Sequence, residues 1–176
     1  MVPVMRVWGW DGKPYNVIQA RMEPVTARPD PIKYYDLWVE GEEDPINRPE
    51  YIKLRVPEDR ICLCTGITDA NGVMVFENDV VCYAMNIAKG KQWEATYTEA
   101  LWAYGQVVPT KRGFMLSDGK ESCGALIDSA HNGCLFVVGS TITHRHLVGN
   151  SFWVPIGVLP LFDPESGEVL NKKEDA

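Results

Sequence analysis

The feature that most constrains the fold of this chain is the turn Asp69-Ala70-Asn71-Gly72, which lies between two apolar runs. Asparagine and glycine accept the positive φ angles of a tight hairpin turn, and an aspartate side chain can bond the amides of its own turn. The run VMVF, residues 73–76, is then the returning strand. Glu77-Asn78-Asp79 makes a second turn, and VVCY, residues 80–83, continues as a buried strand. The stretch therefore predicts antiparallel β-structure.

A second segment shows the alternation of a half-buried strand. In YIKLRV, residues 51–56, every second residue is apolar, so one face carries the set Ile52, Leu54 and Val56, and the other Tyr51, Lys53 and Arg55. Further β-prone segments are residues 4–10, 33–39, 60–64, 141–147 and 151–159. The window KQWEATYTEALWAY, residues 91–104, fits either one short helix or a pair of strands. We predict a mainly β protein with little helix.

Proline and charge suggest how the chain is divided. Six of the twelve prolines lie between Pro24 and Pro57, together with the acidic run EGEED at residues 40–44. Such a segment is typical of an irregular excursion. We predict an N-terminal β and irregular segment over residues 1–59, a second β domain over residues 60–162, and a polar C-terminal tail over residues 163–176.

Composition narrows the classes of partner and compartment. The formal net charge is -7, from 24 acidic and 17 basic residues, which argues against a general binder of the phosphate backbone. No run approaches the ~20 apolar residues of a membrane helix, and the first residues lack the pattern of a signal peptide. The five cysteines are expected to be reduced thiols. We expect a soluble intracellular protein that does not act on membranes.

The carboxylates Glu77 and Asp79 are candidates for binding or catalysis. A calcium loop would place a third ligand where Val73 stands, so calcium does not fit. As an acid–base pair, the two would flank Asn78 in a turn, where carboxylates are usually solvated or cap nearby amides. We predict an architectural role and keep both residues as candidate binding residues.

The same stretch resembles the signature of the YopX-like family of bacteriophage and prophage proteins. That pattern reads T-G-L, an aspartate, N-G, and then an I-Y-E-G-D-I-V segment. The matching residues are Thr65, Gly66, Asp69, Asn71, Gly72, Glu77, Asp79 and Val81. Ile67, Phe76 and Asn78 depart from it, and Asn78 can take the positive φ of the usual glycine. Trp10-Asp11 and VLPLFDPESGEVL, residues 158–170, are similar to the family's first and last elements.

What the resemblance implies is a fold, an origin and a setting. It implies a mostly β protein with an irregular N-terminal part, and it implies that the domain over residues 60–162 is a small SH3-like β-barrel. It also implies a phage genome and action in the host cytoplasm. No reaction follows from it.

Cysteine and histidine residues are the candidates for metal binding or nucleophilic catalysis. The zinc candidates are Cys123, His131, Cys134, His144 and His146, together with the buried-strand cysteines Cys62, Cys64 and Cys82. The sequence has no zinc knuckle, cysteine-hydrolase signature, phosphate loop or dinucleotide motif. We therefore expect no catalytic residue, no metal and no cofactor.

Six tryptophans offer contact surfaces. Trp8 and Trp10 share one face of their predicted strand with Arg6, and this face either packs inward or binds a partner. Our first hypothesis is a homo-oligomeric phage protein that binds a host or phage protein, for instance to interfere with host defence or regulation. The alternative is capture of a small nucleotide-type ligand at a subunit interface. A third hypothesis is a metal-dependent enzyme acting on nucleic acid through Glu77 and Asp79.

Overall fold

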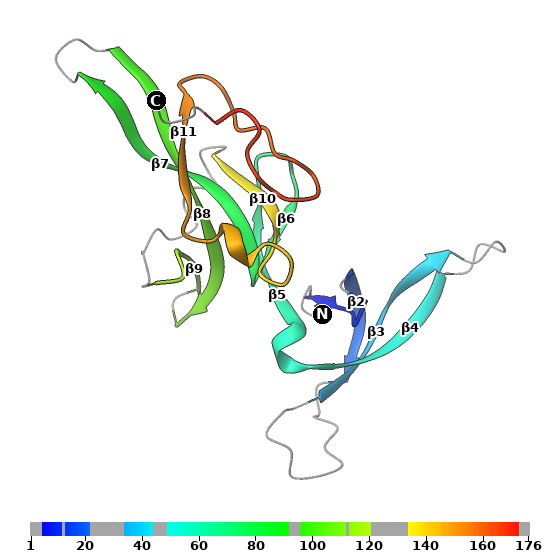
Figure 1. Ribbon diagram of the computed structural model, residues 1–176. Helices are drawn as coiled ribbons and strands as arrows, with labels where there is room; N and C mark the ends of the chain where they lie inside the picture. Colours follow the sequence, from blue (N-terminus) through cyan, green and yellow to red (C-terminus); the bar gives the residue numbers. More distant parts are fainter. Residues whose placement is uncertain are drawn as a thin grey trace. The chain divides into compact units, whose positions relative to one another are not determined.

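The computed structural model describes residues 5–11, 13–21, 34–43, 49–91, 96–111, 113–120 and 134–172 (Figure 1). In these ranges the chain is built of antiparallel strands, and its helical segments are short 3-10 turns. The mainly β prediction is confirmed. Within the same ranges, no helix has the length and apolar character that crossing a membrane requires.

The chain divides into two compact units, Met1–Cys64 and Thr65–Ala176. The division therefore falls after residue 64, where the sequence placed it after residue 59. It lies inside strand β5 (Ile61–Thr68), so one continuous strand contributes residues to both units.

The first unit is a five-stranded antiparallel arrangement with the order β4-β3-β2-β1-β5. Its other elements are β1 (Met5–Trp8), β2 (Pro14–Arg21), β3 (Tyr34–Glu43), β4 (Pro49–Pro57) and the 3-10 turn η1 (Glu58–Arg60). The turn η1 leads from β4 to β5, which returns to pair with β1. Among the described residues no ladder closes this sheet into a barrel. The described part of residues 1–59, predicted as a β and irregular segment, supplies four of these strands.

The core of the first unit follows the alternation of its strands. Four valine and leucine side chains have no exposed surface, namely Val7, Leu37, Val39 and Val56. Leu54 packs against this cluster, while Lys53 and Arg55 are exposed. The predicted alternation of this strand is therefore confirmed for residues 53–56. A strand with one apolar face packs that face inward and leaves the other open for polar contacts.

The second unit is organised around the long strand β8. Its elements are β6 (Met74–Phe76), β7 (Asp79–Lys91), β8 (Thr96–Thr110), β9 (Gly113–Ser117), β10 (Leu135–Ser140), the 3-10 turn η4 (Arg145–Leu147) and β11 (Ser151–Pro155). The sheet order is β10-β7-β8-β11, and β9 also pairs with β8. Strand β7 pairs along one edge of β8. Strands β9 and β11 both pair along the opposite edge of β8 (Figure 1). Residues 96–104 of the window 91–104 belong to β8, which pairs with β7, so the helix alternative is wrong for them; residues 92–95 lie outside the described residues.

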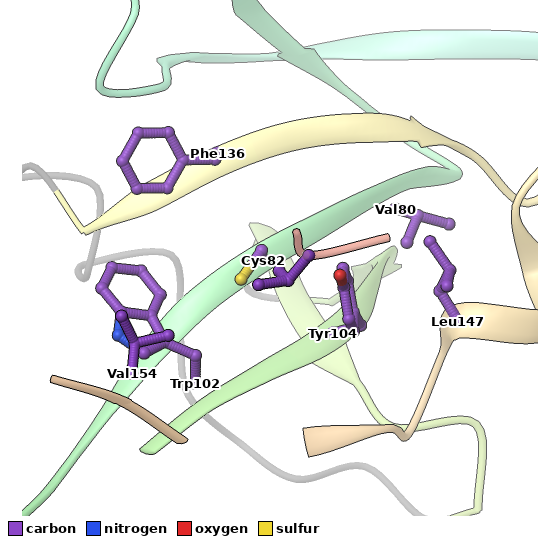
Figure 2. Close-up of a cluster of buried hydrophobic side chains, with 8 residues drawn as sticks. Val80, Cys82, Trp102, Tyr104, Phe136, Leu147 and Val154 are labelled. Atoms are coloured by element: carbon purple, nitrogen blue, oxygen red, sulfur yellow. The ribbon is translucent and has the colours of Figure 1, made fainter. Parts of the chain in front are cut away.

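Both faces of this sheet are buried, which explains the unbroken apolar run in VVCY. Val81 and Tyr83 face one cluster, which also contains Val75 and Leu135. Val80 and Cys82 face the other cluster, which is completed by Trp102, Tyr104, Phe136, Leu147, Val154 and Val169. Figure 2 shows seven residues of this second cluster converging from β7, β8, β10, β11 and η4.

The segment 141–147 is a turn followed by η4, so the strand predicted there is wrong. The carbonyl of Ser140 accepts hydrogen bonds from the amides of Thr143 (3.1 Å) and His144 (2.7 Å). The Ser140 hydroxyl accepts another from the amide of Ile142 (3.2 Å). Local hydrogen bonds of this kind compete with strand pairing. The alternation of apolar residues in the sequence gives no sign of them.

The C-terminal residues 163–172, predicted as a polar tail, fold onto the second unit. Phe162 and Val169 form an antiparallel bridge, and Val169 is buried. The Asp163 carboxylate accepts bonds from the amides of Glu165 (3.0 Å) and Ser166 (2.7 Å). These bonds close a tight turn that brings one apolar residue of a charged segment into the core.

Candidate functional site

Trp10 is exposed and at the same time held in place. Its side chain is 63% exposed, yet its indole Nε1 donates a hydrogen bond to the carbonyl oxygen of Arg55 (3.2 Å). The guanidinium carbon of Arg60 lies 4.3 Å from the centre of the indole ring, in cation–π contact. Arg60 Nη1 also donates to the carbonyl of Gly9 (2.8 Å). The ring is therefore fixed in orientation before any partner arrives.

The turn between β1 and β2 sets this position. The Asp11 carboxylate accepts bonds from the Lys13 amide (3.1 Å) and the Tyr15 hydroxyl (2.9 Å), and the hydrogen bonds lower the pKa of Asp11. The Gly9 amide donates to the Lys13 carbonyl (2.9 Å). A Cβ at Gly9 would lie 2.6 Å from Asp11 Oδ1 and 2.7 Å from the Tyr15 ring, so a larger residue there would require the Asp11 and Tyr15 side chains to move.

A buried aspartate organises the neighbouring strands β3 and β4. Asp36 pairs with Arg55 through Nε–Oδ1 (2.8 Å) and Nη2–Oδ2 (3.2 Å), and with Lys53 through Nζ–Oδ2 (2.8 Å). The Arg55 and Lys53 hydrogen bonds hold the pKa of Asp36 far below its ordinary value, and Asp36 raises the pKa of Arg55. Lys53 Nζ also lies 5.4 Å from the centre of the Trp38 ring.

These contacts join into one surface of the first unit. Trp10 bonds to Arg55, Arg55 and Lys53 share Asp36, and Lys53 covers Trp38. We call this the Trp10–Trp38 surface; its members are Trp10, Trp38, Lys53, Arg55, Arg60 and the buried Asp36. Three cationic groups surround two indole rings, and more than half of the Lys53 and Arg55 side-chain surface is exposed. The arrangement suits binding of acidic and apolar groups.

The other residues of the predicted strand face occupy a different environment. Trp8 is only 7% exposed, and the guanidinium carbon of Arg6 lies 5.6 Å from the centre of its ring. Trp8 is therefore a buried residue, while Trp10, beyond the end of β1, is presented to solvent.

Glu77 and Asp79 lie in the second unit and do not form an exposed pair. Asp79 has no exposed surface, and its Oδ2 accepts a bond from the Phe76 amide (2.8 Å). Asn78 stands between them with φ of 65°. Its amide donates to Val107 O, and its carbonyl accepts from the Thr141 amide, both at 2.9 Å. The turn therefore connects β6, β8 and the segment after β10. Because Asp79 is buried, its carboxylate is not accessible to a binding partner.

The hairpin turn at residues 69–72 forms as predicted and docks onto β10. Asp69 Oδ1 accepts bonds from the amides of Asn71 and Val73, each at 2.8 Å. Its Oδ2 accepts one from the Val137 amide (2.9 Å), and the Ala70 amide donates to Leu135 O (2.9 Å). The side chain is 6% exposed. The motif that carries the family resemblance is therefore structural here.

The zinc candidates do not assemble in the part of the chain that is described. Cys123 and His131 lie outside the described residues. His144 hydrogen-bonds through Nδ1 to Thr143 Oγ1 (2.6 Å) and through Nε2 to Glu165 O (3.0 Å), and its ring centre is 6.3 Å from that of His146. Within the described ranges, no three His, Cys, Asp or Glu residues are placed to hold a metal ion.

The described cysteines are free thiols: Cys62, Cys64, Cys82 and Cys134. Burial raises the pKa of Cys82 far above its ordinary value, because the apolar surroundings disfavour the thiolate. This thiol is packed in the core beside Tyr104 and Phe136 (Figure 2). Its role is therefore that of a small apolar side chain.

Comparison with known proteins does not identify a family for this chain. No protein-family model matches the chain. No curated protein matches it either. The crystal structure of protein EF1440 from Enterococcus faecalis is similar over 80% of this chain and 94% of that chain, with 14% identity and a TM-score of 0.38.

In the sequence, Trp10 shares a face with Trp8 and Arg6, and Lys53 and Arg55 share the polar face of their strand, but nothing joins the two sets. The contacts that join them span 45 residues, from Trp10 to Arg55, and 51 residues, from Gly9 to Arg60. Trp38 and Arg60 were missed as members of the surface. Trp38 lies in the β-prone run 33–39 and Arg60 in the run 60–64, and neither run reveals a contact partner.

Replacing Asp36 by asparagine is expected to change how stability depends on pH. The pKa of Asp36 is lowered by folding, so its stabilising contribution is present above the ordinary carboxyl pKa of about 4 and is lost as pH falls below that value. Urea unfolding at pH 7 should therefore show the Asp36→Asn variant clearly less stable than the wild type, with the gap narrowing toward pH 2.5. A difference in stability between wild type and Asp36→Asn that stays constant with pH would contradict this prediction. The control is Glu58→Gln, at an exposed carboxylate.

Proposed function

We propose that this chain is a non-enzymatic binding protein that engages an acidic segment of another protein through the Trp10–Trp38 surface. The observation that carries the proposal is Trp10, a tryptophan exposed over 63% of its surface and fixed by Arg55 O and the Arg60 guanidinium. Tryptophan and arginine are enriched among the residues that dominate binding energy at protein interfaces. A ring that is already oriented loses little conformational freedom on binding.

The charges of the surface favour an acidic partner. Lys53 and Arg55 share a single carboxylate, that of Asp36, and Arg60 contributes a third cation beside Trp10. The chain as a whole carries a net charge of -7, whereas this surface brings three cationic side chains together around two indole rings. Cationic side chains gathered in this way orient an approaching acidic segment and raise its association rate at low ionic strength.

The resemblance to YopX-like proteins supports a phage or prophage origin and action in the host cytoplasm. In that setting the partner is a host or phage protein, and interference with host defence or regulation is the role we propose. Self-association is part of the proposal, because edge strands such as β4 and β11 must be protected and pairing with a second copy is one solution.

The test uses a displayed library of random twelve-residue peptides selected on the full chain. Enriched peptides should carry several aspartates or glutamates around an apolar residue. We predict that Trp10→Ala weakens their binding roughly thirty-fold, as expected for loss of about 2 kcal/mol at an interface anchor. Met85→Ala, which removes an exposed apolar side chain elsewhere, should leave binding unchanged.

Two outcomes would contradict the proposal: enrichment of peptides without acidic residues, and equal binding by the Trp10→Ala and Met85→Ala variants. Capture from a host lysate adds weight only if it shows the same difference between the two variants. Circular dichroism of both variants confirms that the fold is retained. Rising ionic strength should slow association with the wild type, as expected for a charge-steered encounter.

A small nucleotide-type ligand at a subunit interface is the second candidate. The exposed indole of Trp10 could stack on a base while Arg55 or Lys53 meets a phosphate. Native mass spectrometry of the purified chain separates the two functions. A clean oligomer favours protein binding, whereas a retained mass that absorbs in the ultraviolet and disappears in Trp10→Ala favours nucleotide capture.

A further inference from the structure

The second unit contains a pocket of about 260 Å³ beside the C-terminal segment. We call its buried and half-buried aromatic and aliphatic lining residues the floor: Tyr104, Leu147, Phe152 and Val169. We call its exposed polar lining residues the rim: Asn150, Ser151, Glu168 and Lys172. The pocket lies wholly outside the Trp10–Trp38 surface, so an inference from it does not rest on the proposed function.

The floor is apolar and held in place. The rings of Tyr104 and Phe152 are 5.3 Å apart, and Leu147 and Val169 belong to the same buried cluster. The Tyr104 hydroxyl donates to the carbonyl of Gly167 (3.0 Å), so its polar end is already used in fixing the C-terminal turn. What the floor offers a ligand is therefore contact with hydrocarbon and ring surface.

The rim offers two opposite charges. Glu168 and Lys172 are both exposed, and within the described residues neither forms an ion pair. Asn150 Nδ2 donates to the carbonyl of His146 (3.1 Å), which directs the amide oxygen of Asn150 away from that bond. The exposed Ser151 hydroxyl completes the polar rim.

We propose that this pocket binds a small zwitterion with one apolar side chain, the chemistry of a free apolar α-amino acid. The ligand carboxylate pairs with Lys172, its ammonium group pairs with Glu168, and its side chain lies against the Tyr104–Phe152 floor. A pocket of this volume admits a single side chain of leucine or phenylalanine size. Apolar lining with a few placed polar groups is the usual composition of small-molecule sites.

The test is calorimetric titration of the full chain with L-leucine and L-phenylalanine, followed by three analogues of leucine. Glycine lacks the apolar side chain, 4-methylpentanoate lacks the ammonium group, and leucinamide lacks the carboxylate. Each analogue should bind at least about ten-fold more weakly than leucine, because each removes one of the three contacts. Leucinamide that binds as well as leucine would overturn the proposal in favour of a peptide N-terminus.

Variants at the rim identify the site. Lys172→Gln and Glu168→Gln should each weaken leucine binding about ten-fold, since both side chains are exposed and their loss leaves the core intact. Lys111→Gln, at an exposed lysine in the turn between β8 and β9, is the matched control. Two results would refute the proposal. One is that neither amino acid binds at a concentration of about 10 mM, and the other is that all three variants weaken leucine binding equally.

Discussion

Replacing Asp69 by alanine is expected to lower the free energy of unfolding of the second unit by about 3 kcal/mol, because three backbone amides lose a charged acceptor at once. Those amides belong to Asn71, Val73 and Val137, and the carboxylate is almost fully buried. Two of the bonds shape the hairpin turn and the third docks it onto β10. Urea unfolding followed by tryptophan fluorescence measures the change, since Trp102 and Trp153 report on this unit.

The asparagine variant separates the bonds that shape the turn from the bond that docks it onto β10. Asp69→Asn keeps one carbonyl oxygen, which can still accept from the turn amides, but places an amide group near Val137. We expect a loss of about half that of the alanine variant. Equal stability of Asp69→Ala and wild type would show that the turn forms without its side-chain bonds.

Replacing Gly149 by alanine is the second change with a large expected effect, about 3 kcal/mol of destabilisation. Gly149 has φ of 85°, and a Cβ there would lie 2.7 Å from the carbonyl oxygen of Asp118. The residue therefore combines an unfavourable backbone angle with a backbone contact that cannot move aside. It stands between η4 and β11, where its amide also donates to Tyr104 O (3.0 Å).

Gly157 provides the matched control for this prediction. Its φ is 82°, but a Cβ there meets nothing within 4 Å. Gly157→Ala should cost only about 1 kcal/mol, the penalty of the backbone angle alone. The difference between the two variants in thermal or urea unfolding isolates the contact with Asp118. If both lose the same amount, the contact is relieved by a small movement of the chain.

The parts of the fold that could be predicted are those whose cause is local. The Asp69–Gly72 turn forms because Asp69 bonds amides two and four residues away, and the alternation of residues 53–56 reflects the two faces of one strand. The order of strands, by contrast, depends on which strand meets which. The patterns in the sequence therefore predict single strands but not their neighbours in a sheet.

The missed elements depend on distant partners. The segment 141–147 reads as a strand by alternation, but His144 bonds to a carbonyl 21 residues away at Glu165. Residues 163–172 are polar on average, yet Val169 is buried and Gly167 O accepts the Tyr104 hydroxyl from 63 residues away. In the candidate site, Trp10 was found because it shares a face of its predicted strand with Trp8 and Arg6. Trp38 and Arg60 become partners only through the pairing of β3 with β4 and the position of η1.

The junction formed by Asn78 has a consequence for how a lineage of such proteins can diverge. Its amide, carbonyl and side chain connect to Val107, Thr141 and Gln106, and the neighbouring Asp79 is sealed in the core. Substitutions there are expected to be removed by selection for folding, whatever the protein binds. Residues of the exposed Trp10–Trp38 surface carry no such constraint from the junction. A descendant could therefore exchange its partner while keeping this junction unchanged.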